Sequence, residues 1–270
     1  MDPLTDHWIE ALERRHLADL TRREVARALS ALSSCYVQRR AKLAEGGALS
    51  SAGKRAAFAL FYGPQHFLVT RHIVESLPVA REAISEIVDL GCGTGAAGVA
   101  WALASGARSI RGLDVHPWAV EEANWTYRQF QLDGRAARAN LAVTDASSAK
   151  RTLQAARRGT GILAAYAVNE LPPDGRSALL TALLDAHRRG ARVLVIEPIA
   201  RRLAGVAAWW DSWQAAWESA GGRADEWRFP AALPPTPLAL ARAAGLDPRE
   251  LTARSLFLSF ERSRPAARLV

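Results

Sequence analysis

The pattern of apolar positions changes character near residue 85. Residues 6–77 carry apolar side chains at three- and four-residue intervals, the spacing typical of helices that bury one face. Beyond residue 85, short runs of aliphatic residues alternate with further segments of helical spacing. We therefore expect a helical N-terminal segment or lid, residues 1–83, followed by a second unit, residues 84–270, that mixes strands and helices.

The alternation within the second unit predicts its fold. Strands are expected at 86–91, 109–115, 139–145, 161–171, 191–198 and 251–262, and helices at 96–105, 117–132, 147–158 and 174–189. Repeated strand–helix alternation indicates a mostly parallel sheet with helices on both faces. We predict an α/β, Rossmann-like fold whose last strand runs antiparallel at the edge.

Composition narrows the class of protein. The chain is 270 residues long and 49% hydrophobic, enough for one large core. Its charged start has no apolar region of the signal-peptide kind, and no apolar run approaches the ~18–20 residues of a membrane span. Two cysteines, Cys35 and Cys92, are too few for a disulfide scaffold or a cysteine-built metal site. We expect a cytoplasmic protein without a membrane partner or a metal.

The net charge of +8 is concentrated in one stretch of the chain. Residues 137–202 carry 11 positive and 5 negative side chains. Two Arg-Arg-Gly triplets in this stretch, 157–159 and 188–190, precede apolar runs, which is how helices end: cations oppose the dipole and glycine takes the left-handed cap. A surface that attracts RNA is the other interpretation.

The strongest chemical signal is the segment "IVDLGCGTGAAG" at the first strand-to-helix turn. Gly91, Gly93 and Gly95 allow a tight turn and a close approach of the backbone to a ligand. Asp114 ends the second strand, 19 residues after Gly95, where a carboxylate can accept both hydroxyls of a ribose. Val115 beside it belongs to the same predicted site.

Two ligand classes use this geometry. A dinucleotide needs an anion site at the helix N-terminus, and Asp89, two residues before the first glycine, would lie badly near a pyrophosphate. S-adenosylmethionine (SAM) has no phosphate and carries a positively charged sulfonium and ammonium group. A carboxylate near the glycine turn attracts these positive charges. SAM therefore fits better, with Asp89 and Cys92 in the predicted site.

The sequence resembles the class I SAM-dependent methyltransferases over about residues 84–262. "VDLGCGTG" matches the family's first motif, and Asp114 falls where the ribose-binding acid is found. The resemblance implies that Asp145 and Ala146, in "TDA", hold the adenine. It also places "NELP", which begins at Asn169, on the fourth-strand motif beside the methyl donor.

Methyl transfer requires alignment and removal of a proton from the acceptor. Glu170 is the first candidate for the base or the group that positions the acceptor, and Glu197 and His66 are the next candidates. The alternative is that Asn169 is a strand cap and Glu170 a solvated charge.

Candidate acceptor residues lie outside the cofactor motifs. Tyr62 and His66 flank a Gly-Pro pair in "FALFYGPQHF", which predicts a break that serves either as a lid over the acceptor or as a hydrophobic seam. Arg201 and Arg202 follow the fifth strand and suit an anionic acceptor. The tryptophans at 209, 213 and 217 share a helix face, more typical of a core than of a base-stacking platform.

A narrower resemblance links "YAVNELPP" and "IEP" to methyltransferase-like proteins of the mitochondrial small ribosomal subunit and their bacterial relatives, whose cysteine cluster is absent here. Three functions remain open. The first is methylation of RNA or a ribosomal component, and the second is small-molecule O- or N-methylation. The third is a SAM-binding assembly factor without turnover. The oligomeric state is open.

Overall fold

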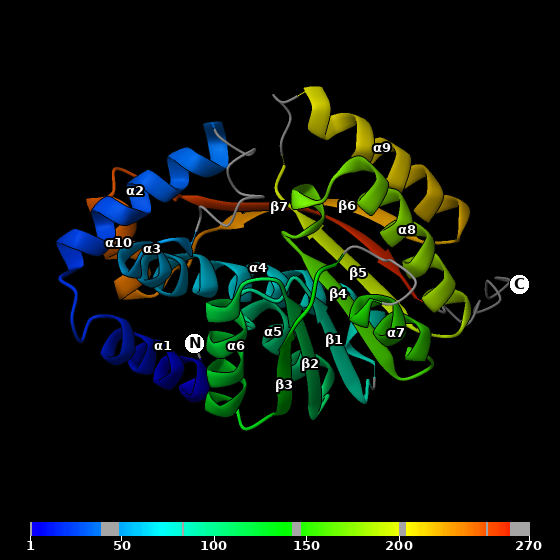
Figure 1. Cartoon of the computed structure of the whole chain (residues 1–270), viewed down its shortest axis with the longest axis horizontal. Coiled ribbons are helices and arrows are strands. Elements are labelled where there is room, and N and C mark those ends of the chain that lie inside the picture. Colours follow the sequence, from blue (N-terminus) through cyan, green and yellow to red (C-terminus); the bar gives the residue numbers. More distant parts are fainter. Residues whose placement is uncertain are drawn as a thin grey trace, which may run out of the picture.

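The computed structural model describes residues 2–38, 49–82, 84–141, 147–199, 204–246 and 248–259. Within them one seven-stranded sheet has the order β3-β2-β1-β4-β5-β7-β6 (Figure 1). The strands are β1 (Glu86–Leu90), β2 (Ser109–Asp114), β3 (Asp133–Arg138), β4 (Thr160–Ala165), β5 (Arg192–Glu197), β6 (Arg223–Pro230) and β7 (Glu250–Leu258). β7 is antiparallel to both neighbours and the others pair in parallel, so the predicted Rossmann-like fold is confirmed.

Helices cover both faces of the sheet (Figure 1). One face is covered by α4 (Gly63–Ser76), α5 (Ala96–Ser105) and α6 (Pro117–Gln129), and the other by α7 (Ser148–Ala155), α8 (Pro173–Arg188) and α9 (Ala204–Ser219). Outside the first layer lie α1 (Pro3–His16), α2 (Arg22–Gln38), α3 (Ala52–Ala57) and α10 (Pro235–Ala243). Three short helical turns are η3 (Phe58–Tyr62), η4 (Pro78–Arg81) and η5 (Val168–Glu170).

The core divides along the plane of the sheet. Because side chains alternate between faces of a strand, Ile87 packs with α4, α5 and α6, whereas Val88 packs with α7, α8 and α9. The tryptophans at 209, 213 and 217 are buried in the second cluster. The core interpretation of that stripe is therefore confirmed.

Three predicted strand positions were wrong. β3 spans Asp133–Arg138 and pairs with β2, whereas a strand was expected at 139–145, of which 142–145 lie outside the described residues. β4 ends at Ala165 instead of 171. β6, which was not predicted, is the antiparallel partner of β7. β3 and β6 are edge strands with mostly exposed or half-buried side chains, so they lack the apolar signal of a buried strand.

One of the two predicted Arg-Arg-Gly helix ends is confirmed. α8 ends at Arg188, Arg189 caps it, and Gly190 follows in the left-handed region with φ 105°. α7 ends at Ala155, two residues before its arginine pair, although Gly159 is also left-handed at φ 92°. No helix in the described ranges is both long and apolar enough to span a membrane.

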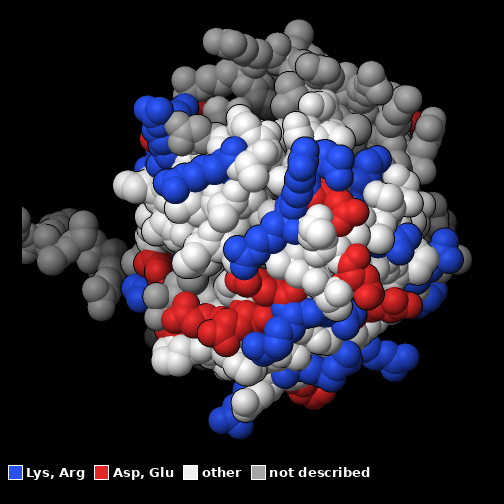
Figure 2. Space-filling model, turned by 90° about the vertical axis from the view of Figure 1, so that its left-hand side faces the viewer, with Lys and Arg blue, Asp and Glu red and all other residues white. Residues whose placement is uncertain are grey.

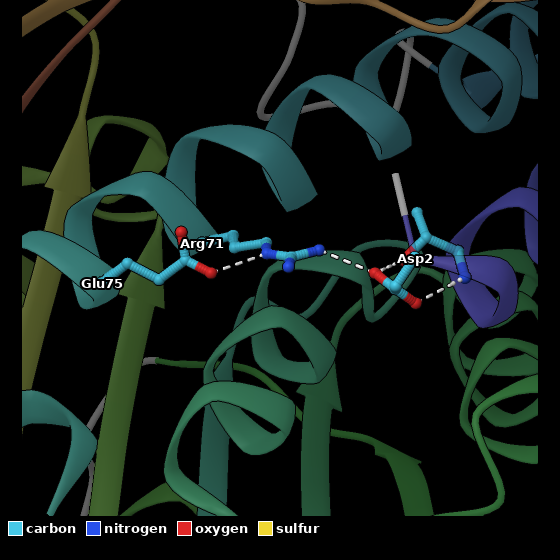
Figure 3. A network of polar contacts seen from close by, with 4 residues as sticks. Asp2, Arg71 and Glu75 are labelled. Atoms are coloured by element: carbon cyan, nitrogen blue, oxygen red, sulfur yellow. Dashed lines mark hydrogen bonds and ion pairs between the residues drawn. The ribbon is translucent and has the colours of Figure 1, made fainter.

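The first helix is held to the sheet layer by ion pairs (Figure 3). Asp2 caps α1 by accepting the Thr5 N–H at 3.0 Å, and Arg71 of α4 donates to Asp2 at 2.7 Å and to Glu75 at 2.8 Å. Desolvation alone would raise the pKa of Asp2, but its bonds with Thr5 and Arg71 lower it to about 2. At the other end of α1, Arg15 donates to Glu122 of α6 at 3.1 Å.

A continuous hydrophobic cluster joins the N-terminal helices to the sheet. Trp8 of α1 and Leu29 of α2 belong to the same cluster as Val99 of α5. The boundary drawn at 83/84 stays a prediction.

Candidate functional site

The glycine-rich turn after β1 lies at the carboxyl edge of the sheet, next to the point where the strand order reverses between β1 and β4. Ligands of open α/β sheets bind at such switch points. Gly91, Gly93 and Gly95 all have positive φ, at 69°, 51° and 78°. A Cβ on Gly91 would lie 2.5 Å from the Cβ of Ala167, so only glycine fits there, as the motif predicts.

Asp114 is oriented by two backbone donors. The Gly93 N–H donates to its Oδ2 at 2.9 Å, and the His116 N–H donates to its Oδ1 at 2.8 Å. The carboxylate therefore ties the end of β2 to the glycine turn. Each oxygen keeps further acceptor capacity, which suits a ribose diol.

Val115 presents an apolar surface beside that carboxylate. Its side chain is 60% exposed, although it follows a buried strand. The adjacent His116 has a buried Nδ1 with no hydrogen-bond partner among the described residues. An exposed apolar side chain and an unpartnered nitrogen next to a positioned carboxylate fit the face and edge of a nucleoside. The residues present thus fit SAM.

Asp89 lies beneath the turn. It is 1% exposed, and the backbone N–H of Gly98, in the first turn of α5, bonds to it. Burial raises its pKa to about 7, the Gly98 N–H opposes this shift, and Asp114 adds to it. Cys92 is also buried, and burial raises its thiol pKa. Their direct contact with the cofactor stays a prediction.

The chain leaves β4 through a strained residue. Tyr166 has φ 59°, a left-handed value that is unfavourable for a bulky side chain, while its N–H bonds to the Ile196 carbonyl at 2.8 Å. The expectation that "YAV" continues the strand was wrong, because this residue turns the chain into η5. Backbone strain of this kind clusters at functional sites.

Glu197, at the end of β5, holds the turn that follows Tyr166. It is fully buried and accepts the N–H groups of Val168 at 2.9 Å and Asn169 at 3.1 Å, as well as the Asn169 side-chain amide. Desolvation raises its pKa to about 8, against the effect of those donors. The side-chain Oδ1 of Asn169 in turn accepts from Trp209 Nε1 at 3.1 Å. These contacts make Glu197 an anchor for the backbone that carries Asn169 and Glu170.

The segment expected to break at Gly63 is a continuous helix. α3, the π-helical turn η3 and α4 run without interruption from Ala52 to Ser76, so the predicted break was wrong. Pro64 lies inside this helix and cannot donate to the preceding turn, and the π-helical turn directly before it is where the hydrogen-bond ladder departs from α-helical spacing. η3 packs on the glycine turn: a Cβ on Gly93 would lie 3.5 Å from the Phe58 ring.

This helix brings His66 onto the strained tyrosine. The His66 and Tyr166 rings stack with centroids 4.0 Å apart and planes at 14°. Desolvation lowers the pKa of His66 to about 3, so the imidazole is neutral at pH 7. Tyr62 lies one turn away from His66, with ring centroids 6.0 Å apart, and burial raises its pKa to about 12.

Apart from the buried Asp89 and Cys92, the sequence-predicted residues that the structure describes divide into three groups. Gly91, Gly93, Gly95, Asp114 and Val115 meet at the carboxyl edge, and Tyr62, His66, Asn169 and Glu197 lie around Tyr166. Glu170 is exposed at the end of η5. The predictions for Asp145, Ala146, Arg201 and Arg202 lie outside the described residues.

Two residues of this site were missed from the sequence. Phe58 covers the glycine turn, and Tyr166 supplies the stacking partner of His66. Both residues lie in segments that the sequence analysis singled out. However, neither the π-helical turn that begins at Phe58 nor the positive φ of Tyr166 has a sequence signature of its own. The strand was expected to continue through Tyr166, so the apolar run before "NELPP" does not indicate the turn at this residue.

Comparison with known proteins agrees with this geometry. Residues 68–152 match the family described as the methyltransferase small domain, a stretch that contains the glycine turn and Asp114. No curated protein matches the chain. The narrower resemblance to the mitochondrial ribosome-associated proteins gains no support.

Solved structures with a similar fold are distant in sequence. The YcgJ protein of Bacillus subtilis is 12% identical with a TM-score of 0.45, over 72% of this chain and all of that one. A SAM-dependent methyltransferase of Aquifex aeolicus is 13% identical with a TM-score of 0.42, over 70% of this chain and 87% of that one. A geranyl diphosphate C-methyltransferase of Streptomyces coelicolor is 12% identical with a TM-score of 0.43, over 72% and 79%.

These similarities leave the methyl acceptor open. The family match includes the glycine turn and Asp114, and the sheet around them is Rossmann-like, so the chain has the fold and the central motif of a SAM-dependent methyltransferase.

Proposed function

We propose that this protein transfers the methyl group of SAM to RNA. The observation that carries the methyl-transfer part is the position of Asp114, held by two backbone N–H groups against a glycine turn with an exposed Val115 beside it. When bound, SAM supplies an electrophilic methyl group. The protein's own residues have to orient this donor, exclude water and accept the acceptor's proton.

Positioning of the donor falls to the edge formed by β1, β2 and β4. Asp114 suits the ribose, Val115 the adenine, and the glycine turn allows the donor to lie against the backbone. Phe58 covers the turn and the His66–Tyr166 stack closes the site from the side of α4. Such a closed wall excludes water from the reacting atoms.

Glu170 is the best of the three predicted groups for accepting the proton. Glu197 is buried and already holds backbone donors, and the lowered pKa of His66 makes it a weak base at pH 7. Glu170 is exposed at the end of η5, beside the strand ends. It can therefore meet an acceptor that approaches from solvent.

The distribution of charge favours RNA as the acceptor. Residues 137–202, which contain the β4 and β5 ends, carry 11 cationic and 5 anionic side chains. Cationic surfaces raise the local concentration of a polyanion. A small-molecule acceptor is the second candidate, and it is favoured by the aromatic wall of Phe58, Tyr62, His66 and Tyr166.

Transfer of labelled methyl groups into a fractionated cell extract tests the proposal. The extract is separated into RNA, protein and small-molecule pools, and each is incubated with methyl-labelled SAM and either the wild-type chain or the Asp114→Ala variant. We expect ribonuclease-sensitive label that depends on Asp114. Label in the small-molecule pool would refute RNA as the acceptor and support the second candidate, a small-molecule acceptor. SAM binding with no label in any pool would indicate an assembly factor without turnover and overturn the proposal.

A further inference from the structure

A hollow of about 530 Å³ opens along β2 and β3, on the side of the sheet that carries α7. Its walls come from β1, β2, β3 and α7, which contribute Glu86, Ser109, Ile110, Arg111, Leu113, Asp133, Arg135, Ala137, Ser148, Arg151 and Thr152. The faces of a mostly parallel sheet are usually covered by helices. Among the described residues, no helix covers this part of the face completely.

The two faces of β3 differ in how they are covered. Gly134 lies against Tyr127 of α6, so close that a Cβ would meet that ring at 2.7 Å. On the opposite face Arg135 and Ala137 are exposed and line the hollow with Ser148 and Arg151 of α7. The uncovered face is thus polar by sequence as well as open in the structure.

Like charges are placed side by side in the hollow. Arg111 and Arg135 are Cα partners on neighbouring strands, an arrangement that is destabilising when nothing else compensates it. Arg111 pairs with Glu86 at 3.0 Å, yet half of its side chain, 49%, stays exposed. Arg151 reaches the same hollow from α7. An anion lying between these guanidinium groups would relieve their repulsion.

A second hollow of about 160 Å³ continues the first toward the amino ends of β1 and β4. It shares Glu86, Arg111 and Thr152 with the first, and it adds Arg157 and Arg158. Together the hollows form what we call the arginine groove, lined by Arg111, Arg135, Arg151, Arg157 and Arg158. Against these five arginines stand two carboxylates, Glu86 and Asp133.

The side of the molecule that carries the N-terminal helices presents described charges of both signs (Figure 2). Figure 2 shows the side that carries the N-terminal helices, where basic and acidic side chains lie in interleaved patches. Several arginines there are paired, such as Arg22 with Glu13 at 3.2 Å and Arg14 with Glu10 at 3.7 Å. The arginine groove differs because its arginines outnumber the carboxylates that line it.

We propose that the arginine groove binds the phosphate backbone of single-stranded RNA and leads it to the methyl-transfer site. The groove follows β2 as far as Leu113, and the next residue is Asp114. A strand lying in the groove would therefore run toward the carboxyl edge where the donor binds. Arginine suits this task because its planar donors match phosphate oxygens. This inference rests on the proposed function and names the surface that holds the acceptor.

RNA binding by a charge-reversed double variant tests the groove. The probe is a fluorescent single-stranded RNA of about 20 nucleotides, followed by anisotropy at several salt concentrations. Arg135→Glu/Arg151→Glu is expected to weaken binding about tenfold or more, and losing two phosphate contacts should reduce the slope of log Kd against log salt by about 1.4. The matched control is Arg23→Glu/Arg242→Glu, which reverses two exposed charges on α2 and α10. It should bind RNA within about twofold of wild type.

Further measurements separate failure of the groove from failure of the proposed function. SAM affinity by calorimetry and the thermal midpoint should be unchanged, and Arg135→Gln/Arg151→Gln replaces the first variant if charge reversal unfolds the chain. Equal RNA affinity of wild type and the groove variant, or no RNA binding by wild type at low salt, would refute the proposal that the arginine groove binds RNA. If RNA binds in the groove but receives no label, the groove is confirmed as an RNA-binding surface and methyl transfer to RNA is refuted.

Discussion

Removal of the Asp114 carboxylate should weaken SAM binding by about tenfold to a hundredfold. In the free protein its two oxygens already accept the Gly93 and His116 N–H groups at 2.9 and 2.8 Å. The remaining lone pairs are available to two ribose hydroxyls. Hydrogen bonds to a charged group contribute about 1.5–3 kcal/mol each, and water entering the space left by Asp114→Ala recovers part of that. A net loss of about 1.4–2.7 kcal/mol corresponds to the stated range.

Isothermal titration calorimetry with SAM and with S-adenosylhomocysteine measures the effect and its cause. Both ligands carry the same ribose, but only SAM carries the sulfonium charge. If Asp114 acts through the ribose, both affinities should fall by the same factor. A loss confined to SAM would mean that the carboxylate acts through its charge on the sulfonium instead.

Glu121→Ala is the matched control, because it removes an exposed carboxylate from α6, the helix that follows β2. It changes the net charge equally and should leave both affinities within about twofold, as exposed substitutions usually do. The thermal midpoint of each variant shows whether the fold is intact. An unchanged dissociation constant for Asp114→Ala would refute the ribose assignment.

Three further predictions concern the glycine turn, the base and the first helix. Gly91→Ala should unfold at clearly lower denaturant than Gly106→Ala and lose SAM binding, since both have positive φ, at 69° and 72°, but only the first new Cβ meets an atom, at 2.5 Å; equal midpoints would exclude the clash. Glu170→Gln should keep SAM affinity and slow methyl transfer about a hundredfold, the scale of one general base, and full activity in a single-turnover assay would remove Glu170 from the mechanism. Because its pKa is lowered from 3.8 to about 2, Asp2 stabilises the fold above pH 4 and loses that contribution as the pH falls through 2; Arg71→Gln should flatten the thermal midpoint between pH 2 and 4, and identical pH profiles would contradict the pairing.

The cofactor side of the site could be predicted from sequence because its signals are local. Glycines at 91, 93 and 95 and an acid at the end of the next strand are dictated by backbone geometry within one βαβ unit. Strands β1, β2 and β5 were also placed correctly, because buried parallel strands form continuous apolar runs.

The elements that were missed depend on distant parts of the chain. β3 reads "DGRAAR", which has no apolar alternation, and it is a strand because β2 offers it an edge to pair with. Likewise Tyr166 takes a positive φ where its N–H bonds to β5 and its ring meets His66, 100 residues earlier. No window of sequence contains both partners of such a contact.

The π-helical turn η3 limits which changes of length the chain tolerates. A π-turn accommodates about one residue more than the α-helix around it, and here it lies between α3 and α4. Deleting one residue from 58–62 would regularise the helix but rotate everything before it by about 100° relative to α4. Phe58 would then lose its contact with Gly93, whereas His66 would keep its stacking contact with Tyr166. Homologous chains that keep this site should therefore conserve the length of segment 58–62 more strictly than its amino-acid identities.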